Sequence, residues 1–201
     1  MTIFLGYEIP TGELVEIPLH HTVITGVTRL SGKTTAAEAI MTRLPAGYQS
    51  LAFRTKRGEL AFGGANIVQP YFVEHTDWQY VESLLEAAMR ERLKFERSWI
   101  IRACRGASSL RQVYENIIER RDREKIRGLD ESVYTNLAAY FEKVLPQLEE
   151  HPFAHALELL PGSNVMDLGH LSEEVQALVI SSVLEHIWQH GRDTVVVIPE
   201  A

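Results

Sequence analysis

The chain has 201 residues, 45% of them hydrophobic, and carries a formal net charge of −7. A chain of this size buries one sizeable core with room for a small appended lobe, which excludes two full domains. Its single cysteine, Cys104, excludes an internal disulfide, and no motif of a catalytic nucleophile surrounds it. The sequence shows neither a secretory signal nor the roughly 20 uninterrupted apolar residues of a membrane span. We therefore expect a soluble, cytoplasmic protein without a membrane partner.

The charge is distributed unevenly along the chain. Residues 90–127 hold 12 of the 20 lysines and arginines but only 6 of the 27 acidic residues, so this segment is +6 and the remainder is −13. Such a basic segment can contact nucleic-acid phosphates, close as an arginine-bearing lid, or form a solvated helical face paired with the acidic body. Its densest part contains Arg120, Arg121, Arg123, Lys125 and Arg127.

The first third of the chain predicts a hairpin and then alternating strands and a helix. Residues 3–19 alternate apolar and polar side chains around a Pro-Thr-Gly-Glu turn, which indicates a β-hairpin. The β-branched run at 21–27 predicts a strand, and the apolar spacing over 34–44 predicts a helix. Residues 48–55 predict a second strand, and a glycine-rich loop follows at 56–64.

Residues 77–148 have helical periodicity almost throughout. Asp77 and Asp130 are placed as N-caps, and Gly106 and Gly128 are placed as breaks between helices. We expect three or four helices that form a lobe.

The end of the chain predicts a return to alternating strands and helices. Residues 164–168 predict a short buried strand, and residues 172–190 predict a helix that opens with an N-cap and two acidic residues. Residues 194–198 form a β-branched run typical of a strand buried on both faces of a parallel sheet. The alternation is typical of an α/β protein with a mainly parallel sheet flanked by helices. We predict a core of residues 1–76 and 149–201, into which the helical lobe is inserted.

A candidate phosphate-binding loop, Gly-Val-Thr-Arg-Leu-Ser-Gly-Lys-Thr-Thr, joins the strand predicted at 21–27 to the helix that follows. Such a loop surrounds a phosphate with backbone N–H groups and points the positive end of a helix at it. Lys33 would neutralise the β- and γ-phosphates and act in catalysis, while the Thr34 hydroxyl would bind Mg²⁺. The spacing is one residue longer than the usual motif, because Val27 stands where the first glycine is expected. The predicted nucleotide-binding residues are Gly26, Val27, Thr28, Arg29, Leu30, Ser31, Gly32, Lys33, Thr34 and Thr35.

Four segments of the chain together resemble the HerA/FtsK branch of P-loop ATPases, which are ring-forming motors that act on DNA. These segments are residues 20–35, 51–59, 164–188 and 194–201, and they keep the order of the family. The resemblance implies a P-loop NTPase fold with an N-terminal β-hairpin and an inserted helical lobe. It also implies that the chain binds ATP and Mg²⁺ and self-associates into a ring, a hexamer in a longer form. DNA and a nuclease or another effector are the partners it suggests.

By the same resemblance, residues 194–201 stand where the family carries its Walker B motif, four apolar residues followed by Asp-Glu. Glu200 takes the place of the glutamate that orients or deprotonates the attacking water. Pro199 replaces the aspartate of the Mg²⁺ shell and offers no ligand, which leaves Asp167 as an alternative metal ligand or as a loop-capping residue. The later sensor and arginine-finger segments are missing after Ala201, so we expect the front part of a longer protein rather than a reduced relative.

A charged loop follows the second predicted strand and contains Arg54, Lys56, Arg57 and Glu59. Ligands of α/β sheets bind at the carboxyl ends of the strands, so these side chains can contact a nucleotide or a neighbouring subunit. Charged loops at strand ends are also common as solvated surface.

Three functions are consistent with these features. The first is the ATP-binding, ATP-hydrolysing domain of a DNA motor. The second is an ATP-sensing scaffold that binds nucleotide without hydrolysing it, which the proline at position 199 would explain. The third is a small-molecule or nucleoside kinase that uses the basic segment as a lid.

Overall fold

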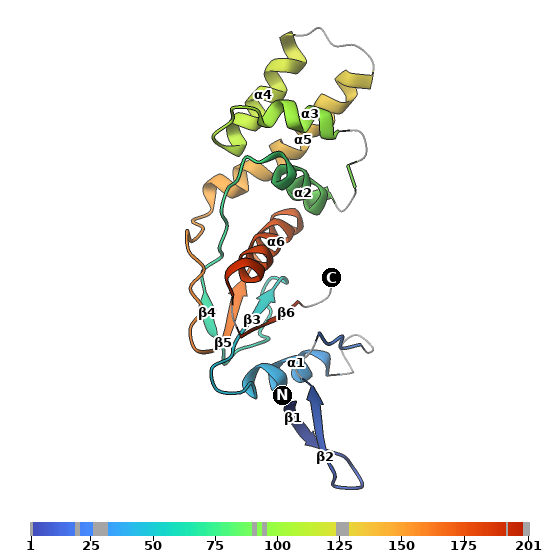
Figure 1. The fold of residues 1–201 in the computed structure, drawn as a ribbon, viewed down its shortest axis with the longest axis vertical. Helices are drawn as coiled ribbons and strands as arrows, with labels where there is room; N and C mark the ends of the chain where they lie inside the picture. The colour runs from blue at the N-terminus through green and yellow to red at the C-terminus, as the bar shows by residue number, and fades with distance from the viewer. Residues whose placement is uncertain are drawn as a thin grey trace. The chain divides into compact units, whose positions relative to one another are not determined.

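The computed structural model describes residues 2–18, 21–25, 32–89, 92–93, 96–123, 129–191 and 193–198. The chain divides into two compact units (Figure 1). Unit 1 comprises Met1–Gln69, Glu158–His170 and Ile187–Ala201, and unit 2 comprises Pro70–Leu157 and Leu171–His186. Unit 1 contains the strands, and unit 2 is built mainly from helices.

The predicted hairpin at the start of the chain is confirmed. Strands β1 (Thr2–Tyr7) and β2 (Leu14–Pro18) pair antiparallel around the Pro-Thr-Gly-Glu turn. Arg43 follows helix α1 (Lys33–Thr42) and donates hydrogen bonds to two backbone carbonyls of β1. Its guanidinium carbon also lies 5.5 Å from the centroid of the Phe4 ring. These contacts attach the hairpin to the end of α1.

Four parallel strands form the main sheet of unit 1, in the order β4-β5-β3-β6. They are β3 (Gln49–Arg54), β4 (Asn66–Val68), β5 (Gly162–Asp167) and β6 (Thr194–Val197). Gln49 is opposite both Gly162 and Thr194, so the three strands start at the same level. Because the strands are parallel, their four carboxyl ends lie along one edge of the sheet. A parallel sheet combined with helices confirms the predicted α/β class.

The core of unit 1 lies between α1 and the sheet. Three consecutive residues of β3, Leu51 to Phe53, have 0% exposure, as expected for a strand covered on both faces. On α1, Ala37 and Met41 are one helical turn apart and pack in a cluster with Ala52, Phe62 and Val165. The buried face of α1 therefore packs against a small residue of β3, Ala52, and a β-branched residue of β5, Val165.

A buried asparagine connects β5 to β3. Asn164 has 0% exposure although it lies in an apolar strand. Its Nδ2 is 3.0 Å from the carbonyl oxygen of Ser50, 2.8 Å from that of Leu160 and 3.2 Å from that of Gly162. Its Oδ1 accepts the N–H of Leu160 at 2.9 Å. Both polar ends of the buried amide are therefore satisfied, as burial requires.

The strand predicted over 21–27 is wrong for its described part. Residues 21–25 form no strand, and Val23 is 86% exposed. A β-branched run favours extended backbone, but a strand forms only where another strand offers a hydrogen-bonding ladder. Residues 26 and 27 lie outside the described residues.

Two further strands differ from the sequence predictions. Strand β4 is not predicted from the sequence, because its three residues are too few to show a period of two. β6 is at an edge of the described sheet and its four residues are half-buried, so its prediction as a strand buried on both faces is wrong. A run of valines predicts that the segment forms a strand, but it does not predict whether the strand is central or at an edge of the sheet.

The region from 77 to 150 contains four helices among its described residues: α2 (Trp78–Met89), α3 (Arg97–Cys104), α4 (Leu110–Arg123) and α5 (Leu129–Glu150). Asp77 is the predicted N-cap, since its Oδ1 accepts the N–H of Gln79 at 2.9 Å. Gly106 separates α3 from α4 with a φ of 77°. Asp130, predicted as an N-cap, is the second residue of α5, because the helix already begins at Leu129. Gly128 lies outside the described residues.

Helix α6 (Glu173–His190) begins and ends where the sequence predicted. Ser172 Oγ accepts the N–H of Val175 at 3.5 Å, and Gly191 ends the helix by donating its N–H to the carbonyl of Ile187 at 2.7 Å. A hydrogen bond from Lys143 lowers the pKa of Glu174 in the first turn. None of the described helices has the length and apolar character needed to cross a membrane.

Cys104, the last residue of α3, is expected to react slowly with thiol reagents. Burial, and secondarily the charge of Asp77, raise the pKa of its thiol to about 11. At pH 8 a thiol of this pKa is ionised about a hundredfold less than one with a pKa near 9. Labelling of the folded protein should therefore be about a hundredfold slower than labelling in urea and should rise about tenfold per pH unit below pH 10. Equal rates in both states would contradict the burial of this thiol.

Candidate functional site

A glycine with a left-handed backbone immediately precedes α1. Gly32, immediately before the helix, has φ 64° and ψ 24°, a left-handed conformation that glycine adopts without strain. The N–H of Ala36 donates to the carbonyl of Gly32 at 2.8 Å and forms the first bond of the helix. The preceding N–H groups therefore have no intrahelical acceptor, and the positive end of the helix lies there. Thr34 and Thr35 are exposed, and Lys33 is half-buried.

The head of α1 lies at the carboxyl edge of the sheet. Near the other end of the helix, the carbonyl of Met41 accepts a hydrogen bond of 3.3 Å from Ser163 Oγ, at the start of β5. Lys33 is about 12 Å back along the helix at 1.5 Å per residue. Asp167 is about 13 Å further along β5 at 3.3 Å per residue. Glu38, nearer the head of the helix, accepts the N–H of Phe62, and the adjacent Ala61 carbonyl contacts Arg54 at the end of β3. These contacts place the Lys33 end of α1 toward the edge at which Asp167 lies.

Two charged groups end neighbouring strands at this edge. Arg54 ends β3 and Asp167 ends β5, directly opposite each other, with Nη1 3.9 Å from Oδ2. Arg54 Nε also donates to the carbonyl of Ala61 at 2.6 Å, and its side chain is only 12% exposed. Asp167 Oδ1 accepts the N–H of Gly169 at 3.0 Å. Asp167 therefore makes a loop-capping contact, while its role as a magnesium ligand stays a prediction.

The loops that follow β3 and β5 approach each other closely. The N–H of Glu59 donates to the carbonyl of Lys56 at 3.2 Å, which closes a turn in which Gly58 has a φ of 73°. A Cβ on Gly169 would lie 2.7 Å from the carbonyl oxygen of Lys56 and 3.1 Å from the Cα of Arg57. Only glycine fits at 169 without moving this turn. The sequence predicts that the charged turn lies at the carboxyl edge of the sheet. It does not predict the need for glycine at 169, which arises from a contact between segments distant in the chain.

Glu38 connects α1 to the loop between β3 and β4. Its carboxylate accepts the backbone N–H of Phe62, a residue with a left-handed φ of 60°. A bulky residue is strained in this conformation. Phe62 is 4% exposed and packs against Ala37 and Met41, so burial offsets the strain.

Glu38→Ala is expected to lower the free energy of unfolding by about 1–2 kcal/mol, because it leaves the N–H of Phe62 without its acceptor. Urea unfolding followed by circular dichroism measures this change. Glu158→Ala, which removes an exposed carboxylate of the same unit, is the matched control and should change the free energy by less than about 0.5 kcal/mol. Equal effects of both substitutions would show that the Glu38 contact contributes nothing.

The other predicted site residues fall outside the described part of the chain. Six of the ten nucleotide-binding residues, Gly26 to Ser31, lie there, as do Pro199 and Glu200. Glu200 follows β6, which runs parallel to β3 with Val197 opposite Ala52. Among the described residues, no three or more His, Cys, Asp or Glu side chains are grouped to hold a metal ion.

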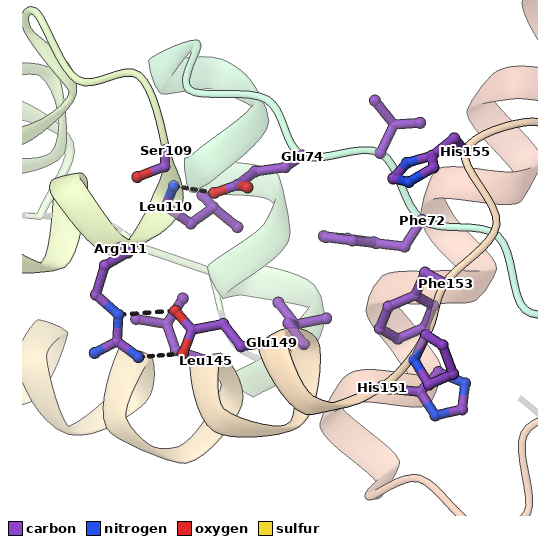
Figure 2. Close-up of a pocket in the computed structure, with 13 residues that line it drawn as sticks. Phe72, Glu74, Ser109, Leu110, Arg111, Leu145, Glu149, His151, Phe153 and His155 are labelled. Atoms are coloured by element: carbon purple, nitrogen blue, oxygen red, sulfur yellow. Dashed lines mark hydrogen bonds and ion pairs between the residues drawn. The ribbon is translucent and has the colours of Figure 1, made fainter.

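Unit 2 contains a cavity of about 490 Å³ (Figure 2). Phe72 and Phe153 line it with ring centroids 5.5 Å apart. On its polar side, Arg111 makes two bonds to Glu149, and Glu74 accepts the N–H of Leu110. The charged lining groups are two carboxylates and one guanidinium, so their net charge is negative. The cavity therefore does not fit a triphosphate.

Part of the basic segment is paired with acidic groups. Arg97 Nε lies 2.8 Å from Glu82 Oε1, and Arg111 Nε lies 2.8 Å from Glu149 Oε1, and both acids are outside the basic segment. These pairs support the prediction of a solvated, paired face for part of the segment. Arg120 lies in α4, whereas Lys125 and Arg127 are outside the described residues. The side chain of Arg123 is also outside them.

Comparison with known proteins identifies a similar fold. No protein-family model matches the sequence, and no curated protein matches it. The solved structure of VirB4 of Thermoanaerobacter pseudethanolicus is similar, with a TM-score of 0.62, 15% identity, and coverage of 98% of this chain and 67% of that chain. At this identity the likeness shows a shared fold.

Proposed function

We propose that this chain binds the phosphates of ATP at the head of α1 and is the nucleotide-binding part of a HerA/FtsK-like DNA motor ATPase. The observation that carries the proposal is Gly32. Its backbone is left-handed, as glycine allows, and Lys33 and Thr34 follow it at the head of a helix that lies toward the carboxyl edge of a parallel sheet. This is the edge at which α/β sheets bind ligands.

The shared fold with VirB4 supports this proposal. The likeness spans nearly all of this chain. At 15% identity it supports the fold, so ATP binding, hydrolysis and any action on DNA remain parts of the proposal.

The described residues fit a phosphate group at this position. Thr34 and Thr35 are exposed at the head of α1, and the N–H groups there point away from the helix. Lys33 would neutralise the phosphates, and the Thr34 hydroxyl would hold Mg²⁺, which would in turn neutralise charge on the phosphates. The predicted loop from Gly26 to Ser31 would complete the cradle. Glu200 remains the predicted catalytic carboxylate.

Calorimetric titration of Mg-ATP into the chain tests nucleotide binding. The proposal predicts saturable binding of one ATP per chain and weaker binding when EDTA removes the magnesium. GTP, titrated in parallel, reports base preference. No heat of binding with any nucleotide, in a protein that circular dichroism shows to be folded, would contradict the proposal.

The contacts of Asp167 favour a second candidate, a scaffold that binds ATP without hydrolysing it. Its two carboxylate oxygens face Gly169 N–H and Arg54. Pro199 stands where the Walker B motif has its aspartate. Phosphate release in the presence of Mg-ATP separates the two candidates. Turnover that disappears in Glu200→Gln would exclude the scaffold, and tight binding without turnover would support it.

The remaining parts of the proposal concern the longer assembly. We propose a nucleotide-binding core of residues 1–76 and 149–201, a helical lobe of residues 77–148, and a ring that acts on DNA with a nuclease or other effector. Sedimentation of an extended protein with ATP and DNA tests this. Ring-sized species are expected, and a persistent monomer would contradict the motor.

A further inference from the structure

We propose that Arg57 contacts the terminal phosphate of the nucleoside triphosphate bound at the head of α1. The inference rests on the proposed function and adds a residue that distinguishes a triphosphate from a diphosphate. Arg57 lies in the turn that follows β3, at the same edge of the sheet as Lys33. Four features of this turn support the role.

The first feature is the defined backbone of the turn. The Glu59 N–H bond to the carbonyl of Lys56 closes a four-residue turn, in which Arg57 is the second residue. Gly58 in the third position has a φ of 73°, and a type II turn requires a positive φ at this position. The side chain of Arg57 is exposed from a fixed backbone position.

The second feature is the close contact between this turn and the loop after β5. The Cα of Gly169 approaches the backbone of Lys56 and Arg57 so closely that a Cβ would lie 2.7 Å from the Lys56 carbonyl oxygen. The N–H of Leu168 also donates to the carbonyl of Arg54 at 2.8 Å. The turn is therefore supported by the backbone that follows the neighbouring strand.

The third feature is the contrast between two arginines of the same loop. Arg54 is 12% exposed and bonds to Ala61 and Asp167, so it holds the base of the loop. Across the described residues, no hydrogen bond or ion pair is made by Arg57. Within this part of the chain nothing neutralises its guanidinium, which could bind an anion.

The fourth feature is chemical complementarity. A guanidinium presents several N–H donors in one plane and binds phosphate oxygens in a bidentate manner. The head of α1 would hold the inner phosphates, and the cation at the same edge would then meet the outermost one. ATP differs from ADP by that phosphate, so Arg57 should affect ATP binding alone.

The test compares the affinities of wild type, Arg57→Ala and Arg57→Lys for Mg-ATP and Mg-ADP by calorimetry. Loss of the contact should weaken ATP binding by about ten- to a hundredfold in Arg57→Ala, with a smaller loss in Arg57→Lys. ADP affinity should stay within about twofold of wild type. Arg102→Ala, which removes an exposed arginine from unit 2, is the control and should change neither affinity.

A second pair of variants tests the turn without touching the arginine. Gly169→Ala would place a methyl group against the Lys56 carbonyl and displace the turn, whereas Gly64→Ala meets nothing within 4 Å. We expect only Gly169→Ala to lose ATP affinity relative to ADP, and thermal melting verifies that both variants are folded.

The outcomes separate the two proposals. Wild-type protein that binds both nucleotides, with Arg57→Ala unchanged or equally weakened for ATP and ADP, would overturn the role of Arg57 alone. Wild-type protein that binds neither nucleotide would overturn the proposed function and this inference together.

Discussion

Replacing Lys33 by alanine is expected to weaken Mg-ATP binding about a hundredfold or more, because the ammonium group would neutralise two adjacent phosphates. Lys33 is the first residue of α1 and is half-buried, so its removal leaves the core of unit 1 in place. The thermal midpoint should therefore stay close to that of wild type. Calorimetry measures the affinity, and circular dichroism measures the fold.

Two controls decide whether the loss at Lys33 is specific. Arg102→Ala removes one positive charge from unit 2 and should leave ATP affinity within about twofold. Lys33→Arg keeps the charge but changes its shape, and we expect it to recover only part of the affinity. If Lys33→Ala binds ATP as tightly as Arg102→Ala does, the nucleotide does not bind at the head of α1.

Asn164→Asp is expected to lower the free energy of unfolding of unit 1 by about 3–5 kcal/mol at pH 7, although the side chains have nearly the same shape. The amide Nδ2 of Asn164 faces three carbonyl oxygens in a fully buried position. A carboxylate there would face those oxygens with its negative charge and without water. Urea unfolding measures the loss.

The pH dependence of this variant gives a second test. Burial would raise the pKa of the new carboxyl group above that of the unfolded chain, so the neutral form would be favoured on folding. The deficit relative to wild type should shrink as the pH falls toward 4, since the protonated group can donate one hydrogen bond. Asn66→Asp, at an exposed position whose Nδ2 is 3.2 Å from the Ser163 carbonyl, should cost less than about 1 kcal/mol. Equal costs at both positions would contradict the account of Asn164.

Features set by neighbouring residues were predictable from the sequence. The apolar spacing over 34–44 predicts helix α1, and Asp77 predicts the start of α2. The apolar residues within 48–55 predict strand β3. Each of these depends on periodicity or on capping, which act over a few residues.

Features set by distant contacts were not predictable. Residues 21–25 have strand composition but no strand in the described structure, since pairing depends on which edge is available. Gly169 is ordinary in sequence, and its requirement comes from the approach of Lys56, more than a hundred residues away. A polar Asn164 in an apolar strand is explained only by its four hydrogen bonds, which join it to Ser50, Leu160 and Gly162.

The candidate site was predictable in chemistry and less so in geometry. The Gly-Lys-Thr tripeptide identified the head of α1, and the left-handed Gly32 fits it. The sequence left Asp167 between metal binding and loop capping, and the structure shows its capping contact with Gly169. Arg54 and Arg57 were one charged loop in the sequence, but only the structure separates the buried anchor from the exposed guanidinium.

The central claim is that the head of α1 binds the phosphates, and the most direct measurement is an amide NMR titration of ¹⁵N-labelled protein with Mg-ATP. Bound phosphate oxygens accept hydrogen bonds from backbone N–H groups, which shifts the amide proton resonances downfield. We predict the largest shifts at Gly32, Lys33, Thr34 and Thr35. Shifts clustered instead around Phe72, Leu110 and Phe153, with the head of α1 unchanged, would place the ligand in the cavity of unit 2 and contradict the claim.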